Sequence, residues 1–231
     1  MKTRQKLRRT LAEFVVVVVG VMVALAGDNW REAWQDSRLE STYLDRLRLE
    51  VEKGLDAQAR ERIRVEAARS AILSLVERLD ASGDQVLAGD SLVDRFLVAA
   101  RLGFQRNQFG PDVTYRELVA SGQLHLIQDP LTREAIVEYY SNLDQVQAQA
   151  SRVVPLQTQV ARLTGHLPFE FIGGDASLSE EDRQRLLEIL QSGDVLPDLR
   201  EARSDLNLLD MFMGFLNEAA ASLLGRLGQP R

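Results

Sequence analysis

The strongest constraint on this chain is an apolar run, LAEFVVVVVGVMVALA, at residues 11–26. Five basic residues and no acidic residue precede it: Lys2, Arg4, Lys6, Arg8 and Arg9. A basic tip followed by an apolar run is typical of a signal peptide or of a membrane-spanning helix. The run is about 24 Å long as a helix, somewhat less than the ~30 Å hydrocarbon core of a bilayer.

The sequence around the end of this run favours a retained anchor over a cleaved signal peptide. Ala24-Leu25-Ala26 before Gly27 matches the outline of a cleavage site. A peptidase needs an extended substrate, however, and here the apolar run continues into these residues without a polar or helix-breaking residue. We therefore expect a cytoplasmic tail at residues 1–10, a transmembrane helix at 11–29 and an extracytoplasmic domain at 30–231.

Residues on both sides of the expected span suit the two membrane interfaces. Arg8 and Arg9 can extend their guanidinium groups into the headgroups. Glu13 lies near the same interface, where a carboxylate costs less than at the bilayer centre. Trp30 and Trp34, four residues apart, suit the opposite interface. These five residues form the predicted membrane-interface set.

Orientation follows from the basic tail. Because basic residues stay on the cytoplasmic side, we expect a bacterial inner-membrane protein with its N-terminus inside and its domain in the periplasm. Within the span, Gly20 and Ala24 form a small-xxx-small pair, a pattern that lets two membrane helices approach each other. The lipid bilayer is thus one expected partner, and a second copy of the chain is another.

Two stretches resemble a family of bacterial single-span membrane proteins whose shared domain has no assigned function. They are EFVVVVVGVMVALAGDNWREAW at residues 13–34 and TYRELVASGQLHLIQDPLTREAIVEYY at residues 114–140. The resemblance implies a retained N-terminal helix and a helical domain beyond it. It implies no activity.

Composition excludes several classes of function. The chain carries 28 basic against 34 acidic residues, and five of the basic ones belong to the tail. An acidic domain does not suit nucleic acid, whose phosphates need a basic face. The chain has no cysteine, which excludes disulfides, thiolate nucleophiles and cysteine-ligated zinc.

A helical rhythm extends through residues 30–80, and we expect one long helix that leaves the membrane and ends near the turn at 80–84. Apolar residues recur there at steps of three or four, as at Leu44, Leu47, Val51, Leu55, Ala59 and Ile63. A second helix is expected over residues 91–102.

Start signals predict two further helices. Thr114-Tyr-Arg-Glu117 has the pattern of a capping box, with Val113 and Leu118 placed for a hydrophobic staple. This helix should end at Gly122. Asp129 followed by Pro130 predicts a capped helix with proline in its first turn.

The remaining pattern is also helical. The helix from Pro130 is expected to reach Leu163 with a kink near Pro155. Another is expected to open at residues 177–180 and stop at Gly193, and the last should cover 197–227. The fold class predicted is all-α: a transmembrane helix that continues into a long helix, followed by an antiparallel bundle. Charged residues argue against a second span in the last helix, namely Arg203, Asp205, Asp210, Glu218 and Arg226.

Few residues suggest chemistry, and no catalytic, cofactor-binding or metal-ligating residue is predicted. His125 is expected to bond nearby backbone, although a pH-sensitive or ligand-contacting role is the alternative. His166 and Glu170 lack a third metal ligand. Glu134 and Glu138 are one turn apart and can present paired carboxylates, but a solvated helix face is the simpler interpretation.

Four aromatic residues fall in two expected loops: Phe104, Phe109, Phe169 and Phe171. Aromatic side chains in such loops can form a surface that docks a partner. They can equally pack into the end of the bundle, and the sequence leaves both interpretations open.

Together these features predict a membrane-anchored helical module that acts through a protein partner or through self-association. The alternative is a periplasmic bundle that senses a small molecule and signals through a partner, because a tail of ten residues cannot carry a signal by itself. An enzyme, such as a carboxylate-dependent hydrolase, is the least favoured class.

Overall fold

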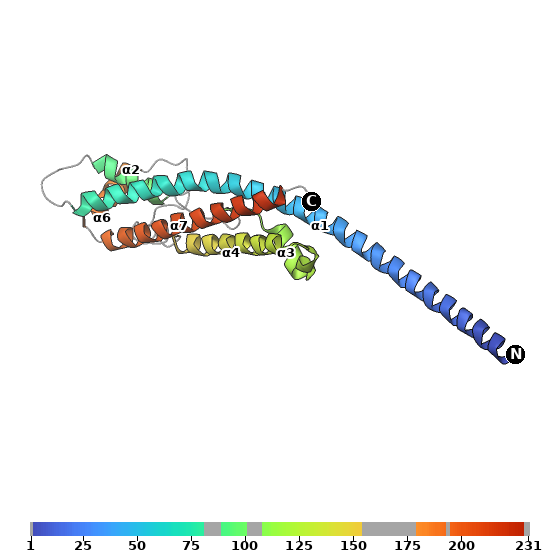
Figure 1. Cartoon of the computed structure of the whole chain (residues 1–231). Helices are drawn as coiled ribbons and strands as arrows, with labels where there is room; N and C mark the ends of the chain where they lie inside the picture. The colour runs from blue at the N-terminus through green and yellow to red at the C-terminus, as the bar shows by residue number, and fades with distance from the viewer. Residues whose placement is uncertain (1, 81–88, 101–107, 154–178, 193–194, 229–231) are drawn as a thin grey trace.

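The chain is described by a computed structural model at residues 2–80, 89–100, 108–153, 179–192 and 195–228. Within these residues the regular structure is helical throughout, which confirms the all-α prediction. Figure 1 shows the helices in chain order: α1 (Lys2–Asp80), α2 (Gly89–Ala100), α3 (Val113–Ala120), the 3-10 helix η1 (Gln123–Leu126), α4 (Pro130–Val153), α6 (Glu180–Ser192) and α7 (Leu196–Leu227).

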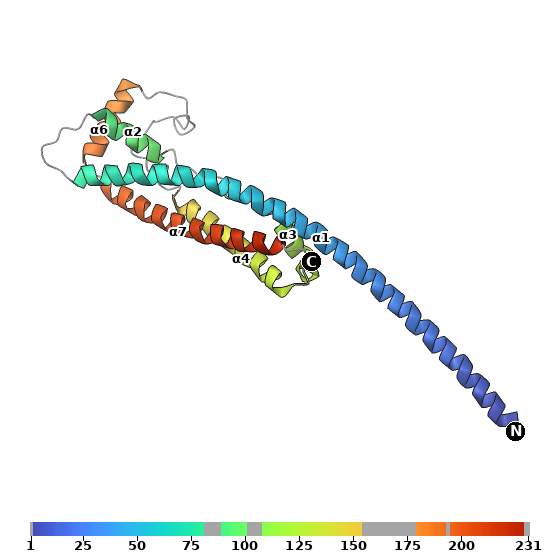
Figure 2. The same cartoon turned by 45° about the horizontal axis from the view of Figure 1, so that its top comes forward.

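Helix α1 dominates the shape of the molecule. It contains 79 residues without a break, about 120 Å at 1.5 Å per residue. Its N-terminal half projects away from the other helices, as both views show (Figures 1 and 2). Among the side chains described, the first that is buried belongs to Glu40. The predicted long helix is therefore present, and it extends without interruption into the predicted span.

The bundle is built on the C-terminal half of α1, on α4 and on α7. Arg200 of α7 pairs with Asp80 at 2.6 Å, and Arg69 of α1 pairs with Asp210 at 3.3 Å. These two contacts show that α7 runs back along α1. The apolar faces of the three helices meet in one core, which includes Leu47, Ile72, Ile136, Leu143, Leu206 and Leu216.

Helices α2 and α6 cover the end of the bundle far from the projecting part of α1. Arg95 of α2 donates to the Ser74 hydroxyl of α1 at 2.9 Å, and Phe96 fills the core at 2% exposure. Arg183 of α6 pairs with Asp94 of α2 at 2.9 Å. Helix α6 therefore contacts α2, and α2 in turn contacts α1.

In the described part of the chain, α7 is long and apolar enough to cross a membrane by length and composition. In this fold its most buried residues, including Leu199, Leu206 and Leu223, belong to the common core. One face of α7 therefore packs against α1 and α4, while Met211 and Phe215 remain exposed.

The signal at the start of α4 is confirmed. The Asp129 carboxylate accepts the backbone N–H of Thr132 at 2.9 Å and, more loosely, that of Leu131 at 3.4 Å. Pro130 is the first residue of the helix, where its missing N–H costs nothing. The predicted extension of this helix to Leu163, with its kink, lies outside the described residues.

The capping box predicted at Thr114 is wrong. Helix α3 begins at Val113, so Thr114 is already inside it, and its backbone N–H donates to Glu50 of α1 at 2.9 Å. Glu117, expected to cap this N-terminus, instead pairs with Arg46 of α1. The predicted staple is also missing, since Val113 is 65% exposed. Contacts with α1 have replaced the local cap.

Two glycines permit a close approach between α1 and the segment before α3. A Cβ on Gly54 would collide with the Tyr139 hydroxyl, and a Cβ on Gly110 would lie 3.0 Å from the Gly54 Cα. Gly110 also has a φ of +148°, which side chains rarely adopt. Glycine weakens the interior of a helix, but here Gly54 provides the space that the crossing needs.

Gly54→Ala is therefore expected to lower the free energy of unfolding by about 1–3 kcal/mol, because the buried Tyr139 ring must move. The control is Gly214→Ala in α7, where nothing lies within 4 Å of the added methyl group. That variant should be more stable by roughly 0.5–1 kcal/mol, since alanine favours a helix over glycine. Urea denaturation followed by circular dichroism measures both. Equal effects of the two substitutions would contradict the proposed crossing.

Candidate interaction site

The part of α1 between the predicted span and the bundle is exposed on all sides. We call residues 30–39 the stalk; each of its side chains is exposed. Trp30 is 78% exposed and Trp34 is 56% exposed, and the Arg38 guanidinium lies 4.7 Å from the centre of a Trp34 ring. Two large indole rings in water are unfavourable. The stalk therefore presents apolar surface without cover from the bundle.

The other residues predicted for the membrane lie further along the projecting helix. Arg8, Arg9, Glu13 and Ala24 belong to its helical backbone, and their side chains are outside the described set. Gly20 is exposed, with nothing within 4 Å of a Cβ placed on it. Its surface is thus open to contact from outside the chain.

A second feature holds the part of α1 that follows the stalk. Residues 109–128, which we call the clasp, run back along α1 from Gln58 to Glu40. The backbone carbonyl of Phe109 accepts from the Gln58 amide at 3.1 Å, and the backbone N–H of Gln128 donates to Glu40 at 2.8 Å. The two ends of the clasp are therefore bonded to Gln58 and Glu40, which are eighteen residues apart along α1.

Polar contacts also hold the middle of the clasp. Arg46 pairs with Glu117 at 2.6 Å, and the Tyr43 hydroxyl donates to the Gln123 side-chain oxygen at 2.7 Å. Glu50, which is only 6% exposed, accepts the Thr114 N–H. Together with Gly54, which lies against Gly110, the partners on α1 recur at steps of three or four residues, so one face of α1 carries all of these contacts.

Aromatic rings join the clasp to α4. The rings of Tyr115 and Tyr140 stack with centroids 4.2 Å apart, and Tyr139 meets Tyr140 edge-on at 4.9 Å. Burial raises the pKa of Tyr139 to about 12. Burial first, and then the nearby charge of Glu50, raise the pKa of Tyr140. Both hydroxyls therefore remain protonated at neutral pH.

The expectation that Phe109 forms part of a partner surface is wrong. Its side chain is 1% exposed, because the clasp turns it into the core beside Gln58. The alternative interpretation, packing into the bundle, holds for this residue. Phe104, Phe169 and Phe171 lie outside the described residues.

His125 bonds nearby backbone, as predicted. Its Nδ1 lies 2.8 Å from the carbonyl oxygen of Gly122, and the ring is exposed. His166 and Glu170 fall in a part of the chain that the structure does not describe. The described residues contain no group of three His, Cys, Asp or Glu side chains placed to hold a metal ion.

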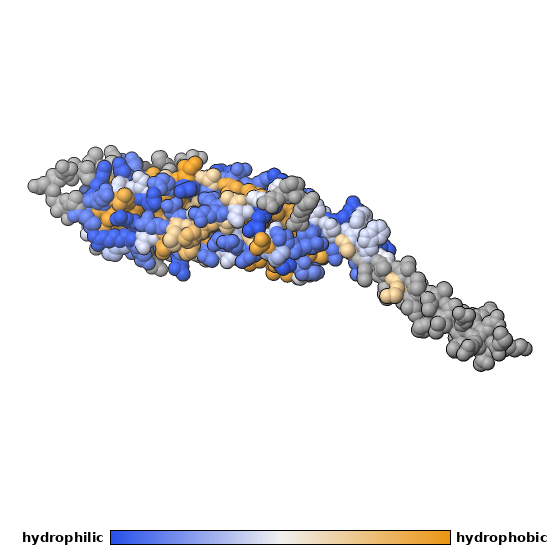
Figure 3. All heavy atoms as spheres, viewed as in Figure 1, coloured by the Kyte–Doolittle hydropathy of each residue, from blue (hydrophilic) through white to orange (hydrophobic). Residues whose placement is uncertain are grey.

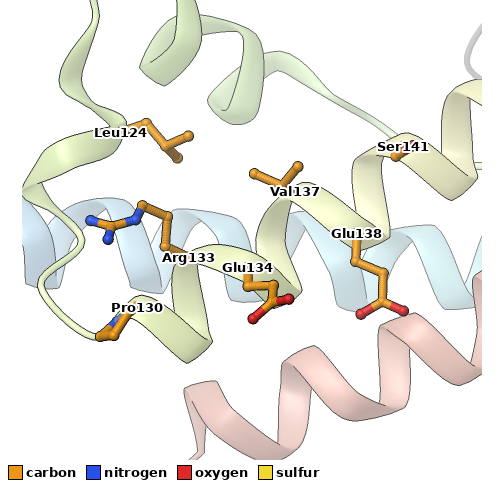
Figure 4. A pocket seen from close by; sticks show the side chains of 7 residues that line it. All are labelled: Leu124, Pro130, Arg133, Glu134, Val137, Glu138 and Ser141. Atoms are coloured by element: carbon orange, nitrogen blue, oxygen red, sulfur yellow. The ribbon is translucent and has the colours of Figure 1, made fainter.

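An open groove lies where η1 meets the first turns of α4 (Figure 4). Its volume is about 620 Å³. Both members of the predicted carboxylate pair line it, which the sequence alone could not show. The lining residues are Leu124, Pro130, Arg133, Glu134, Val137, Glu138 and Ser141.

The face of the bundle seen in Figure 3 is largely hydrophilic, with apolar residues in separate groups. Such scattered groups are normal for a folded domain. On α7, Leu208, Met211 and Phe215 also expose apolar surface. The stalk presents exposed indole rings, and the groove combines apolar and acidic residues, so both are candidate contact sites.

Comparison with protein-family models, with curated proteins and with solved structures gives no match. The resemblance to single-span membrane proteins stays a prediction from sequence. Its second stretch, residues 114–140, covers most of the clasp and the first turns of α4.

Replacing Glu50 tests whether the clasp depends on buried bonds to α1. Glu50→Ala leaves the Thr114 N–H without its partner, and we expect a loss of about 1–3 kcal/mol in the free energy of unfolding. The control is Glu52→Ala, which removes an exposed pair with Arg48 and should cost under about 0.5 kcal/mol. Hydrogen exchange at residues 113–120 should rise only in the first variant; unchanged protection there would contradict the assignment.

The clasp should also respond to acid through Glu117. The hydrogen bond from Arg46 is the main cause that lowers the pKa of Glu117 in the folded chain. Its ionised form thus stabilises the fold above the unfolded pKa, and this contribution is lost as pH falls through the lowered folded pKa. Arg46→Met should raise the pKa of Glu117, whereas Arg48→Met should leave it unchanged. An NMR titration of the Glu117 carboxyl measures this pKa in the unsubstituted chain and in both variants. Equal pKa values in all three chains would refute the link between Arg46 and Glu117.

Proposed function

We propose that this chain is a membrane-anchored helical module whose bundle binds a protein partner, or a second copy, outside the cytoplasm. One observation carries the proposal. Helix α1 is unbroken from Lys2 to Asp80, and among its described side chains burial begins only at Glu40. A helix that projects roughly 55 Å from its bundle (Figure 2) needs another environment to stabilise it.

A lipid bilayer fits the projecting segment. The apolar run at residues 11–26 lies in the part of α1 that extends beyond the bundle (Figure 2). The backbone around Gly27 is helical rather than extended, which supports retention of the anchor because a peptidase needs an extended site. With the basic tail held on the cytoplasmic side, the bundle lies in the periplasm of a bacterial inner membrane.

The stalk then separates the membrane from the bundle. Trp30 and Trp34 follow the apolar run and suit the outer interface, where indole rings are stabilised. From Trp30 to Glu40 the helix rises about 15 Å. The end of the bundle that carries the clasp thus lies close to the bilayer surface with room for another polypeptide.

The bundle's charge and surface favour a protein partner. Its acidic balance does not suit nucleic acid. Self-association through Gly20 and Ala24 in the span is the homo-oligomeric form of the same proposal. A small-molecule sensor is the second candidate, but the groove at α4 is open, and small-molecule sites usually enclose most of the ligand.

The chain contains only two tryptophans, Trp30 and Trp34, so its tryptophan fluorescence reports the stalk directly. In nanodiscs, we expect emission to be quenched by lipids brominated near the headgroups more than by lipids brominated near the tail ends. Leu39→Trp, in a chain whose two native tryptophans are replaced by phenylalanine, is the control and should be quenched least.

If neither brominated lipid quenched the native tryptophans more than the control, the stalk would lie in water and the anchor would be overturned. N-terminal sequencing of the chain from its native host provides a separate check, because a mature sequence that begins at Gly27 would show release from the membrane.

A further inference from the structure

We infer that the groove between η1 and α4 binds a partner segment in which an apolar side chain is flanked by arginine or lysine. The inference deepens the proposed function, since it rests on the bundle being the part that binds a partner. It names the chemistry of the partner and the residues that recognise it.

The floor of the groove is apolar and accessible. Leu124 of η1 and Val137 of α4 face each other across it, with Pro130 at one end (Figure 4). Val137 is 40% exposed, although it lies on a helix that packs against the core. An apolar side chain placed here would cover this surface and remove it from water.

Two carboxylates border the floor. Glu134 and Glu138 both line the groove and project on the same side of α4 (Figure 4). Residues four apart on a helix are neighbours, so the two charges reinforce each other. Neither forms an ion pair with any residue in the described part of the chain.

Arg133 is the one cation among the lining residues, and it is already engaged. Arg133 donates to the backbone carbonyl of Ile127 at 3.1 Å and so holds the turn between η1 and α4. The acidic residues of the neighbouring clasp differ from those of the groove. Asp112 pairs with Arg116, and Glu117 pairs with Arg46. The clasp carboxylates stabilise the fold, whereas those of the groove remain available to a basic ligand.

The position of the groove fits a partner that is itself in the membrane. The groove occupies the start of α4, and the bond between Gln128 and Glu40 places this end of the bundle beside the stalk. A basic segment in the periplasmic part of such a partner would meet it close to the bilayer. The acidic balance of the bundle would speed such an encounter.

The test uses the full chain in nanodiscs of zwitterionic lipid, so that lipid charge does not attract the probe. The probe is a fluorescein-labelled peptide, ALRALRALA, and its comparator carries glutamate in place of each arginine. Fluorescence anisotropy measures binding. We expect Glu134→Gln with Glu138→Gln to weaken binding of the basic peptide about tenfold, the order expected for two exposed charge pairs.

Two further variants make the result specific. Glu180→Gln with Glu181→Gln removes the same charge from α6, at the far end of the bundle, and should leave binding unchanged. Val137→Ser keeps the charges but removes one of the apolar side chains of the floor, and should weaken binding several-fold. Circular dichroism confirms that each variant is folded.

The inference is overturned if the acidic comparator binds equally well, if the basic peptide does not bind, or if the α6 pair weakens binding as much as the α4 pair. None of these outcomes bears on the membrane anchor, which the tryptophan measurement tests independently. Conversely, if the stalk tryptophans lay in water and the peptide still bound, the proposed anchor would be overturned and the proposed binding groove would stand.

Discussion

The structure depends on the continuity of α1: a single helix forms both the projecting segment and the central element of the bundle. Its direction relative to the bundle is set by contacts with the clasp, from Gln58 to Glu40. Helices α2 and α7 pack on the same helix, which curves as it leaves the bundle and continues into the projecting part (Figure 1). The clasp supplies both polar bonds to α1 and apolar side chains to the core, among them Phe109, Leu118 and Ile127.

The helices themselves could be predicted because their signals are local. The stripe from Leu44 to Ile63 has the period of a helix, and Asp129 with Pro130 is a start signal complete within a few residues. The capping box failed for the opposite reason. A cap motif states which bonds neighbours in sequence can form, and here Glu50, sixty-four positions away, took the Thr114 N–H instead. Nothing in the four residues of the motif carries that information.

In the candidate site, too, local spacing could be predicted from the sequence and contacts between distant residues could not. The spacing of Glu134 and Glu138 predicts their shared face on a helix, but the groove also needs Leu124, which η1 brings from outside that helix. Phe109 could not be placed correctly because a loop aromatic next to a glycine has no periodicity that separates surface from core. The sequence does contain one relevant signal, since Gly54 inside a long helix and Gly110 beside Phe109 both mark places where backbones approach closely.

The absence of a hinge within α1 has a mechanical consequence. Any rotation of the N-terminal segment about its own axis is transmitted along a continuous backbone to Glu40, where the last residue of the clasp is attached. A rotation of the projecting segment would therefore reach η1 and the start of α4 through this hydrogen bond. Movement at one end of the molecule is in this way coupled to the orientation of the surface that carries the groove.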